Sequence, residues 1–308
     1  MKDRLVTLFG GGGFLGRYVA QELLKAGARV RIAQRDPREA WFIRPLGGLG
    51  QTQFVAADVT KPDSVARAAA GSHGVVNLVG VLAGNFRGVH VDGAAAIAKA
   101  TRDAGAESLV HISAIGADRE SPSAYGRSKA GGEEAVRAAF PTATILRPSI
   151  LFGREDHFVN RFAEMIRMMP IVPVIGGRTK FQPAYVTDVA RTVVASLADP
   201  ERHGGQTYEL GGPEIISMAD LNARIAGWLG RKRSFPAVPD GMAAALSRLP
   251  CAPITHDQWQ MLQADNVVNP GAKGFAEFGI TPTPMATVVP DWLVQYRRHG
   301  RFANVRAA

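Results

Sequence analysis

The first half of the chain alternates short β-branched segments with alanine-rich segments, and this alternation limits the fold more than any other feature. Helices are predicted at residues 17–27, 62–71 and 94–105, several of them closed by glycine. Strict alternation of strand and helix implies right-handed crossovers and a parallel sheet covered on both faces. We therefore predict an α/β fold with a doubly wound parallel sheet. Its strands are predicted at residues 5–9, 29–33, 52–57, 74–80, 108–113 and 143–149.

The pattern loosens after about residue 150. A helix is predicted at 154–169, a short strand at 171–175, another helix at 186–199 and another strand at 206–212. From about residue 214 the chain is mainly helical, with prolines between the helices. We expect a larger lobe made of residues 1–170 and the returning residues 186–212. Residues 171–185 and 213–308 are expected to form a smaller, mainly helical lobe.

The composition is that of an ordinary globular protein, with 46% hydrophobic and 20% charged residues. The single cysteine, Cys251, excludes an intrachain disulfide and fits a reducing compartment. The first residues do not resemble a signal peptide, and no run reaches the ~18 apolar residues of a membrane span. We expect a cytoplasmic protein, or one held peripherally on the inner face of the cytoplasmic membrane.

The formal net charge is +9, from 36 Lys and Arg against 27 Asp and Glu. This balance favours anionic partners, such as a nucleotide phosphate, an acidic protein face or an anionic lipid surface. Nucleic acid is disfavoured, because the basic residues are spread along the chain and no nucleic-acid motif accompanies them. The histidines show no metal-ligand spacing with each other or with Cys251, so we predict no metal site.

A glycine-rich loop, "GGGGFLG", joins the first predicted strand to the first helix. Gly10 permits a tight turn, Gly13 lets the backbone approach a pyrophosphate, and Gly16 lets the helix pack closely. The helix would then present its first N–H groups to the phosphates. Since the loop lies between a strand and a helix, as this motif requires, we predict a Rossmann-type domain that binds a dinucleotide.

The end of the second strand, "AQRDP", bears on which dinucleotide is bound. An acidic side chain here would accept hydrogen bonds from the ribose of NAD. Arg35 instead offers a planar cation suited to a 2′-phosphate, with Arg17 and Arg38 in support. Asp36 is the competing candidate, although it is also placed to cap a helix that begins at Pro37. We predict NADP(H), with NAD(H) as the alternative. Asp58 either accepts a hydrogen bond from the adenine amino group or holds a turn.

Tyr125 and Lys129 stand four residues apart in "YGRSK", so on a helix they share one face. An adjacent ammonium lowers the pKa of a phenol, which would make Tyr125 usable as an acid or base. The two residues alone do not establish a site, because this spacing also arises by chance.

The glycine loop, "NLVG" (77–80), "YGRSK" (125–129) and "LRPSILFG" (146–153), in this order, resemble the extended and atypical short-chain dehydrogenases. The likeness covers nearly the whole chain. The strings "RPLGGLGQ", "FGREDHFVNRFA" and "QPAYVTDVA" are most similar to the short-chain-dehydrogenase-like accessory subunit of respiratory complex I and its bacterial homologues.

The resemblance implies roles for particular residues. Tyr125 would be the acid/base, Lys129 would lower its pKa and hold the nicotinamide ribose, and Ser113 would orient a substrate carbonyl. The residues after Ser113 are Ala114 and Ile115, where active members of the superfamily usually carry another hydroxyl. The cofactor-binding residues expected are Gly10, Gly13, Phe14, Leu15, Gly16, Arg17, Arg35, Asp58, Val59, Asn77, Gly80, Tyr125, Lys129, Pro148 and Ser149.

Two functions follow from the resemblance. The first is an accessory, assembly or stability factor of respiratory complex I that keeps NADP(H) as a structural ligand. The second is an active NADP(H)-dependent oxidoreductase or epimerase with an apolar or quinone-related substrate. The C-terminal "DWLVQYRRHGRF" either contacts an anionic membrane or a partner subunit, or is simply a terminal helix with cations at its end.

Overall fold

The structure, a computed structural model, describes residues 1–249, 254–298 and 300. Cys251, His299 and Arg301 lie outside the described residues. Contacts divide the chain into two compact units. The first comprises Met1–Pro148, Val186–Leu210 and Asn269–Thr281, and the second Ser149–Tyr185, Gly211–Val268 and Pro282–Ala308. Compared with the expected boundaries, residues 149–170 belong to the second unit, and residues 269–281 return to the first.

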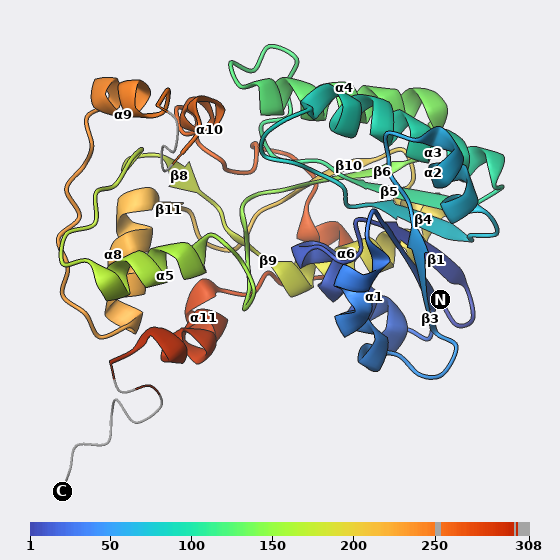
Figure 1. Ribbon diagram of the computed structural model, residues 1–308, viewed down its shortest axis with the longest axis horizontal. Coiled ribbons are helices and arrows are strands. Elements are labelled where there is room, and N and C mark those ends of the chain that lie inside the picture. The colour runs from blue at the N-terminus through green and yellow to red at the C-terminus, as the bar shows by residue number, and fades with distance from the viewer. Residues whose placement is uncertain (250–253, 299, 301–308) are drawn as a thin grey trace, which may run out of the picture. The chain divides into compact units, whose positions relative to one another are not determined.

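The first unit contains a seven-stranded parallel sheet with flanking helices (Figure 1). The strand order is β10-β6-β5-β4-β1-β2-β3, which confirms the predicted doubly wound α/β fold. Its elements are β1 (Leu5–Phe9), α1 (Phe14–Lys25), β2 (Arg29–Gln34), the 3-10 helix η1 (Pro37–Leu46), β3 (Thr52–Ala56), α2 (Pro62–Ala69), β4 (Gly74–Asn77), the π-helix η2 (Arg87–Asp92), α3 (Gly93–Asp103), β5 (Ser108–Ile112), α4 (Ala124–Ala139), β6 (Thr144–Pro148), α6 (Val186–Ala198), α7 (Pro200–His203), β10 (Thr207–Leu210) and the 3-10 helix η3 (Phe275–Phe278).

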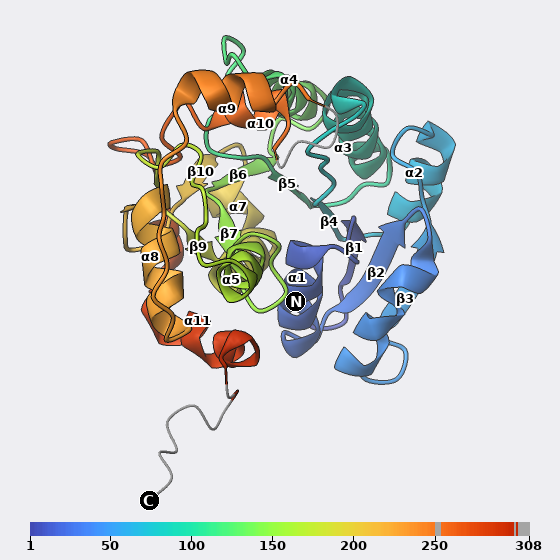
Figure 2. The ribbon, with the colours of Figure 1, turned by 60° about the vertical axis from the view of Figure 1, so that its left-hand side comes forward.

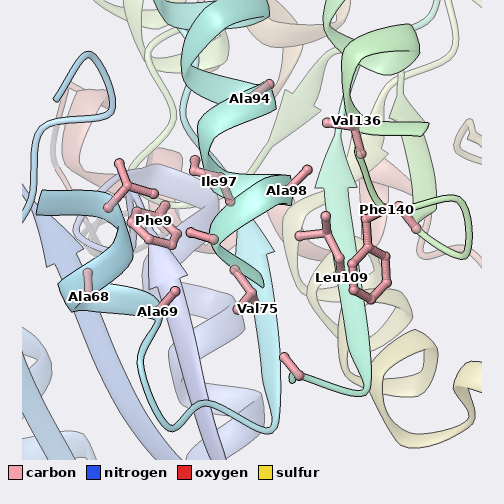
Figure 3. Close-up of a cluster of buried hydrophobic side chains, with 14 of the residues drawn as sticks. Phe9, Ala68, Ala69, Val75, Ala94, Ile97, Ala98, Leu109, Val136 and Phe140 are labelled. Atoms are coloured by element: carbon pink, nitrogen blue, oxygen red, sulfur yellow. The ribbon is translucent and has the colours of Figure 1, made fainter. Parts of the chain in front are cut away.

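Helices α2, α3 and α4 cover one face of the sheet, and α1 and α6 pack together on the other (Figure 1). Under the first group lies a core in which alanines of α3 let the helix backbone approach the strands closely (Figure 3). Ile97 and Ala98 pack there against Phe9, Val75 and Leu109, all of them fully or almost fully buried. This burial fixes the register of the central strands, and Phe9 of β1 pairs with Asn77 of β4 where both strands end.

The second unit has its own core, to which α5, α8 and α11 contribute (Figure 2). Its elements are β7 (Leu151–Phe152), α5 (Val159–Met168), β8 (Lys180–Phe181), β9 (Ala184–Tyr185), β11 (Ile216–Ser217), α8 (Met218–Trp228), α9 (Asp240–Leu246), α10 (His256–Met261), α11 (Met285–Leu293) and the 3-10 helix η4 (Val294–Tyr296). The described part of the chain contains no helix with the length and apolarity needed to cross a membrane.

Two expectations for this unit are wrong in detail. Residues 171–175 make only isolated bridges, from Ile171 and Val174 to residues 234 and 237. Helix α5 begins at Val159, not at 154, because the buried Asp156 carboxylate accepts hydrogen bonds from the N–H groups of Gly153 and Val159 and so holds a turn. In the C-terminal segment, for which two roles were left open, Trp292 and Leu293 are buried in the core.

Candidate functional site

The glycine loop has the geometry that a bound phosphate group requires. Gly10 has φ +78°, a conformation that L side chains rarely adopt, and a Cβ there would lie 3.3 Å from the Leu78 carbonyl carbon beyond β4. A Cβ at Gly16 would lie 2.4 Å from the Gly11 carbonyl oxygen, so only glycine lets α1 pack on the loop. Phe14 and Leu15 open α1, whose first amides have no partners within the helix. The loop therefore offers a backbone that a ligand can approach. The free N–H groups are those of the first turn of α1, because the loop amides of residues 10–13 donate hydrogen bonds within the protein.

The loops after β1 and β4 meet at the point where the strand order reverses, which is where open α/β sheets bind ligands. Asn77 is buried, and its side-chain oxygen accepts a hydrogen bond from the Val79 N–H at 3.1 Å. Its amide nitrogen donates to His111 Nδ1 at 3.0 Å. Gly80 follows, with open space up to the His90 ring, 3.7 Å from where its Cβ would be. Asn77 thus shapes the turn that faces the glycine loop.

Helix α4 carries the predicted Tyr125 and Lys129, and it brings Lys129 beside the end of β5. Lys129 is 4% exposed, and its ammonium donates to the Ile112 carbonyl oxygen at 2.7 Å. Ser113 comes next in the chain, and its buried hydroxyl has no hydrogen-bond partner in the described residues. A buried, unpartnered hydroxyl is costly, and a ligand group that bonded it would remove that cost. The structure therefore brings Ser113 and Lys129 together and leaves one polar group for a ligand.

The expected lowering of the Tyr125 pKa is wrong. Burial raises the pKa of Tyr125 to about 12, and no opposing effect of Lys129 is found. Burial lowers the pKa of Lys129 to about 8, with partial compensation by Glu133. For both pKa values, desolvation is the largest effect, because burial disfavours the charged form of each group. At neutral pH the phenol is protonated and suited to donate a hydrogen bond.

His90, on the π-helix η2, joins the β4 loop to α4, and the sequence analysis missed it. Its Nε2 accepts from the Val81 N–H at 2.9 Å, so its Nδ1 carries the proton. That Nδ1–H donates to Ser128 Oγ at 2.8 Å, and the Ser128 hydroxyl donates to the Tyr125 carbonyl oxygen at 2.7 Å. The His90 ring also packs edge-to-face against Tyr125. Only the tertiary structure brings these residues together, and no local pattern around His90 indicates its role.

His111 of β5 is buried, and only one of its two ring nitrogens has a hydrogen-bond partner among the described residues. Its Nδ1 accepts from Asn77, but Nε2 has no partner among the described residues. Burial lowers the pKa of His111 well below its ordinary value, so the ring is neutral. In the part of the chain that the structure describes, no three His, Cys, Asp or Glu side chains gather as a metal site would need.

At the end of β2, the two candidates for ribose recognition differ. Asp36 caps η1 by accepting from the Arg38 N–H, and it pairs with the Arg38 guanidinium at 2.8 Å. The hydrogen bonds from Arg38 lower the pKa of Asp36. Arg35 is exposed and makes no hydrogen bond or ion pair with another described residue. Arg17 stacks over the Phe42 ring at 4.2 Å. The Asp36 carboxylate and the Arg38 guanidinium are therefore bonded to each other, whereas the Arg35 guanidinium can bond a ligand phosphate.

Asp58 holds a turn, which was one of its two expected roles. Its Oδ1 accepts from the N–H and the hydroxyl of Thr60, at 3.0 and 2.7 Å, and these bonds lower its pKa. Val59 packs at the start of α3, where a Cβ on Gly93 would lie 2.9 Å from Val59 Cγ2.

Pro148 ends β6, and its carbonyl oxygen accepts from the Ile115 N–H at 3.1 Å. Ser149 belongs to the second unit, and its hydroxyl donates to Asn266 Oδ1 at 2.6 Å. Because this hydroxyl already has a partner, Ser149 is less suited than Ser113 to bond a ligand.

The residues gathered at the ends of β1, β4 and β5 fit a nicotinamide dinucleotide. The glycine loop is a cradle that a Cβ would obstruct, and the unpartnered Ser113 hydroxyl lies beyond it. A dinucleotide bound there would be held by the first amides of α1 and by Tyr125 and Lys129 of α4, and it would supply hydride chemistry.

Residues 6–211 match the NAD dependent epimerase/dehydratase family. The chain belongs to this family of nicotinamide-dinucleotide-binding proteins, and its Rossmann-like fold and glycine loop are of the kind the match implies.

Within the family, the chain is similar to subunits of respiratory complex I. It is 36% identical to the mouse mitochondrial "NADH dehydrogenase [ubiquinone] 1 alpha subcomplex subunit 9" over 96% of this chain and 81% of that protein. It is 30% identical to a ceramide reductase of Caulobacter vibrioides, over 73% of this chain and 77% of the reductase. Among solved structures, Citrobacter sp. triphenylmethane reductase complexed with NADP(H) shares the fold, with a TM-score of 0.75 and 19% identity, covering 94% of this chain and 99% of that one.

Proposed function

We propose that this protein binds NADP(H) as a structural ligand and serves as an accessory, assembly or stability factor of respiratory complex I. The observation that carries the proposal is the 36% identity to a complex I subunit over 96% of the chain, which spans both units. We further propose that it works on the cytoplasmic side of the membrane that holds complex I.

The charge states of Tyr125 and Lys129 support an anchoring role for the nucleotide. A phenol with a pKa near 12 is a poor proton acceptor at neutral pH, but it is a good hydrogen-bond donor to a ribose oxygen. The Lys129 ammonium, held by the Ile112 carbonyl, can donate to the same ribose. Both groups can therefore hold a nucleotide without proton transfer.

The state of Arg35 favours NADP(H) over NAD(H). Its guanidinium has no partner in the described residues, whereas Asp36 is already bonded to Arg38. A free guanidinium suits the 2′-phosphate that only NADP(H) carries. Replacing Arg35 with Ala is expected to weaken NADPH binding about tenfold or more and NADH binding much less. Equal weakening of both nucleotides, measured by calorimetry, would contradict the assignment.

An active oxidoreductase or epimerase is the second candidate. The buried Ser113 hydroxyl favours it, because this group is free to orient a substrate carbonyl. The similarity to a ceramide reductase makes a long apolar substrate worth testing. Tyr125→Phe removes the phenol and keeps the ring. An enzyme would lose most NADPH oxidation with such a substrate, whereas a structural factor would keep its nucleotide and its fold.

The first experiment is native separation of gently solubilised membranes from the source organism, with this chain detected beside complex I activity. Co-migration that survives moderate salt is the expected result. A chain found only in the soluble fraction would refute the accessory role. The Tyr125→Phe variant should co-migrate as the wild type does if the phenol serves only as an anchor.

A further inference from the structure

The segment after β2 exposes a group of large apolar side chains that the nucleotide site does not use. Trp41 is 50% exposed, Phe42 38%, Leu46 43% and Leu49 107%, all within nine residues. We call these four residues and Arg44 the η1 surface. Exposed apolar groups this close together mark interaction sites more often than ordinary surface.

Arg44 lies within cation–π distance of two aromatic rings. The Arg44 guanidinium lies 5.6 Å from the centre of the Trp41 ring and 5.8 Å from that of Phe54. A guanidinium stacked on aromatic rings loses water from its face but keeps N–H donors at its edge. Arg44 has no ion pair with any described acidic residue. It is therefore ready to accept a carboxylate from another molecule.

A hollow of about 800 Å³ opens beside the η1 surface and includes Arg35, which is proposed above for the 2′-phosphate. Its lining is Arg35, Asp36, Pro37, Arg38, Trp41, Arg44, Thr52, Gln53 and Phe54. Strand β3 is the last strand of the sheet, and Thr52 pairs with Val30, four residues before β2 ends at Gln34. At about 3.3 Å per residue, the hollow extends roughly 13 Å along the sheet edge from the end where a dinucleotide would lie. It is therefore larger than a 2′-phosphate site needs to be.

We propose that the η1 surface and this hollow dock an acidic segment of a protein partner. An apolar side chain of the partner enters the hollow beside Trp41 and Phe54, and a carboxylate bonds Arg44. This inference rests on the proposed function, which makes a complex I subunit the source of the segment.

Two features favour a protein partner over an anionic membrane. The cations of residues 35–54 are all arginines, and the large exposed groups include Trp and Phe, which is the composition of protein interfaces. An open hollow with Trp41 and Phe54 in its lining suits a protruding side chain better than the plane of lipid head groups.

The test uses Leu49→Asp and Arg44→Glu, each expressed as the only copy in the source organism. Ile215→Asp is the matched control, since Ile215 is a 59% exposed apolar residue in the second unit. We expect the amount that co-migrates with complex I to fall roughly tenfold for Leu49→Asp and Arg44→Glu and to stay unchanged for the control. Leu49 is fully exposed, so NADPH binding by Leu49→Asp should equal that of the wild type and show that the variant is folded.

The outcomes separate this inference from the proposed function. If the wild type co-migrates and both variants do so equally well, the docking surface is wrong and the accessory role stands. If the wild type itself does not co-migrate, the accessory role fails first. Binding of the purified wild type to phosphatidylglycerol-containing vesicles that Leu49→Asp abolishes would assign the surface to lipid instead. A wild-type dimer in light scattering that Leu49→Asp converts to monomer would assign it to a second copy.

Discussion

Lys129 is expected to destabilise the ligand-free fold, so its replacement by Met should stabilise the chain at neutral pH. Burial lowers the pKa of Lys129 from 10.5 to about 8. At about 1.4 kcal/mol per pH unit, keeping the ammonium buried at pH 7 costs about 3 kcal/mol. The Met side chain loses the hydrogen bond to the Ile112 carbonyl, worth about 1 kcal/mol. The net expectation is a Lys129→Met variant more stable by about 2 kcal/mol.

The stability difference between the wild type and Lys129→Met should depend on pH. Between pH 8 and 10.5 the unfolded chain keeps the Lys129 proton that the folded chain has released. Stability of the wild type therefore rises with pH in this window, and the advantage of the Met variant shrinks by about 2 kcal/mol between pH 7 and 9.5. Lys129→Met should weaken nucleotide binding although it stabilises the fold. The ammonium whose burial costs stability is also the group expected to hold the ribose.

The assay is urea unfolding of the wild type and Lys129→Met at pH 7 and 9.5, with and without NADPH. Lys99→Met is the control, since Lys99 is exposed on α3 and its removal should leave the pH dependence unchanged. A Met variant less stable than the wild type at pH 7, or an advantage equal at both pH values, would refute the reasoning. NADPH should stabilise the wild type more than the variant.

Two further predictions concern the glycine loop and His90. Gly16→Ala should lower stability by about 1–3 kcal/mol, because its Cβ would overlap the Gly11 carbonyl, whereas Gly13→Ala should fold nearly normally and lose NADPH affinity. Urea unfolding and nucleotide titration of both variants check this, and equal stability losses would contradict it. Burial lowers the pKa of His90 to about 4, so the unfolded chain binds the extra proton between pH 6.5 and 4, and stability falls as the pH drops through this window. The His90 contribution is about 2 kcal/mol at pH 5, and His90→Gln should lose less stability between pH 7 and 5 than the wild type. Parallel pH profiles of the two proteins would show that His90 is not responsible.

The ligand-binding end of the sheet was largely predictable because its signals are local. A left-handed turn at Gly10 and the close packing at Gly16 each require glycine, and each lies between a strand and a helix in the sequence itself. The alternation of strands and helices likewise implied the parallel sheet. Helix α6 and strand β10 of the first unit were also predicted at nearly their observed positions. Backbone conformation and hydrophobic periodicity depend on residues that are close in the sequence, so both can be predicted from the sequence alone.

Other features depended on which distant residues meet. The Tyr125 pKa was predicted in the wrong direction because pair spacing on a helix says nothing about burial, and desolvation outweighs the neighbouring ammonium. The role of His90 rests on bonds to Val81 and Ser128, which come from two other elements. The sequence by itself determined the fold class and the glycine cradle, through short-range conformational limits. Only the tertiary structure decided which polar groups are buried, bonded or left free, because desolvation and pairing depend on everything packed around a group.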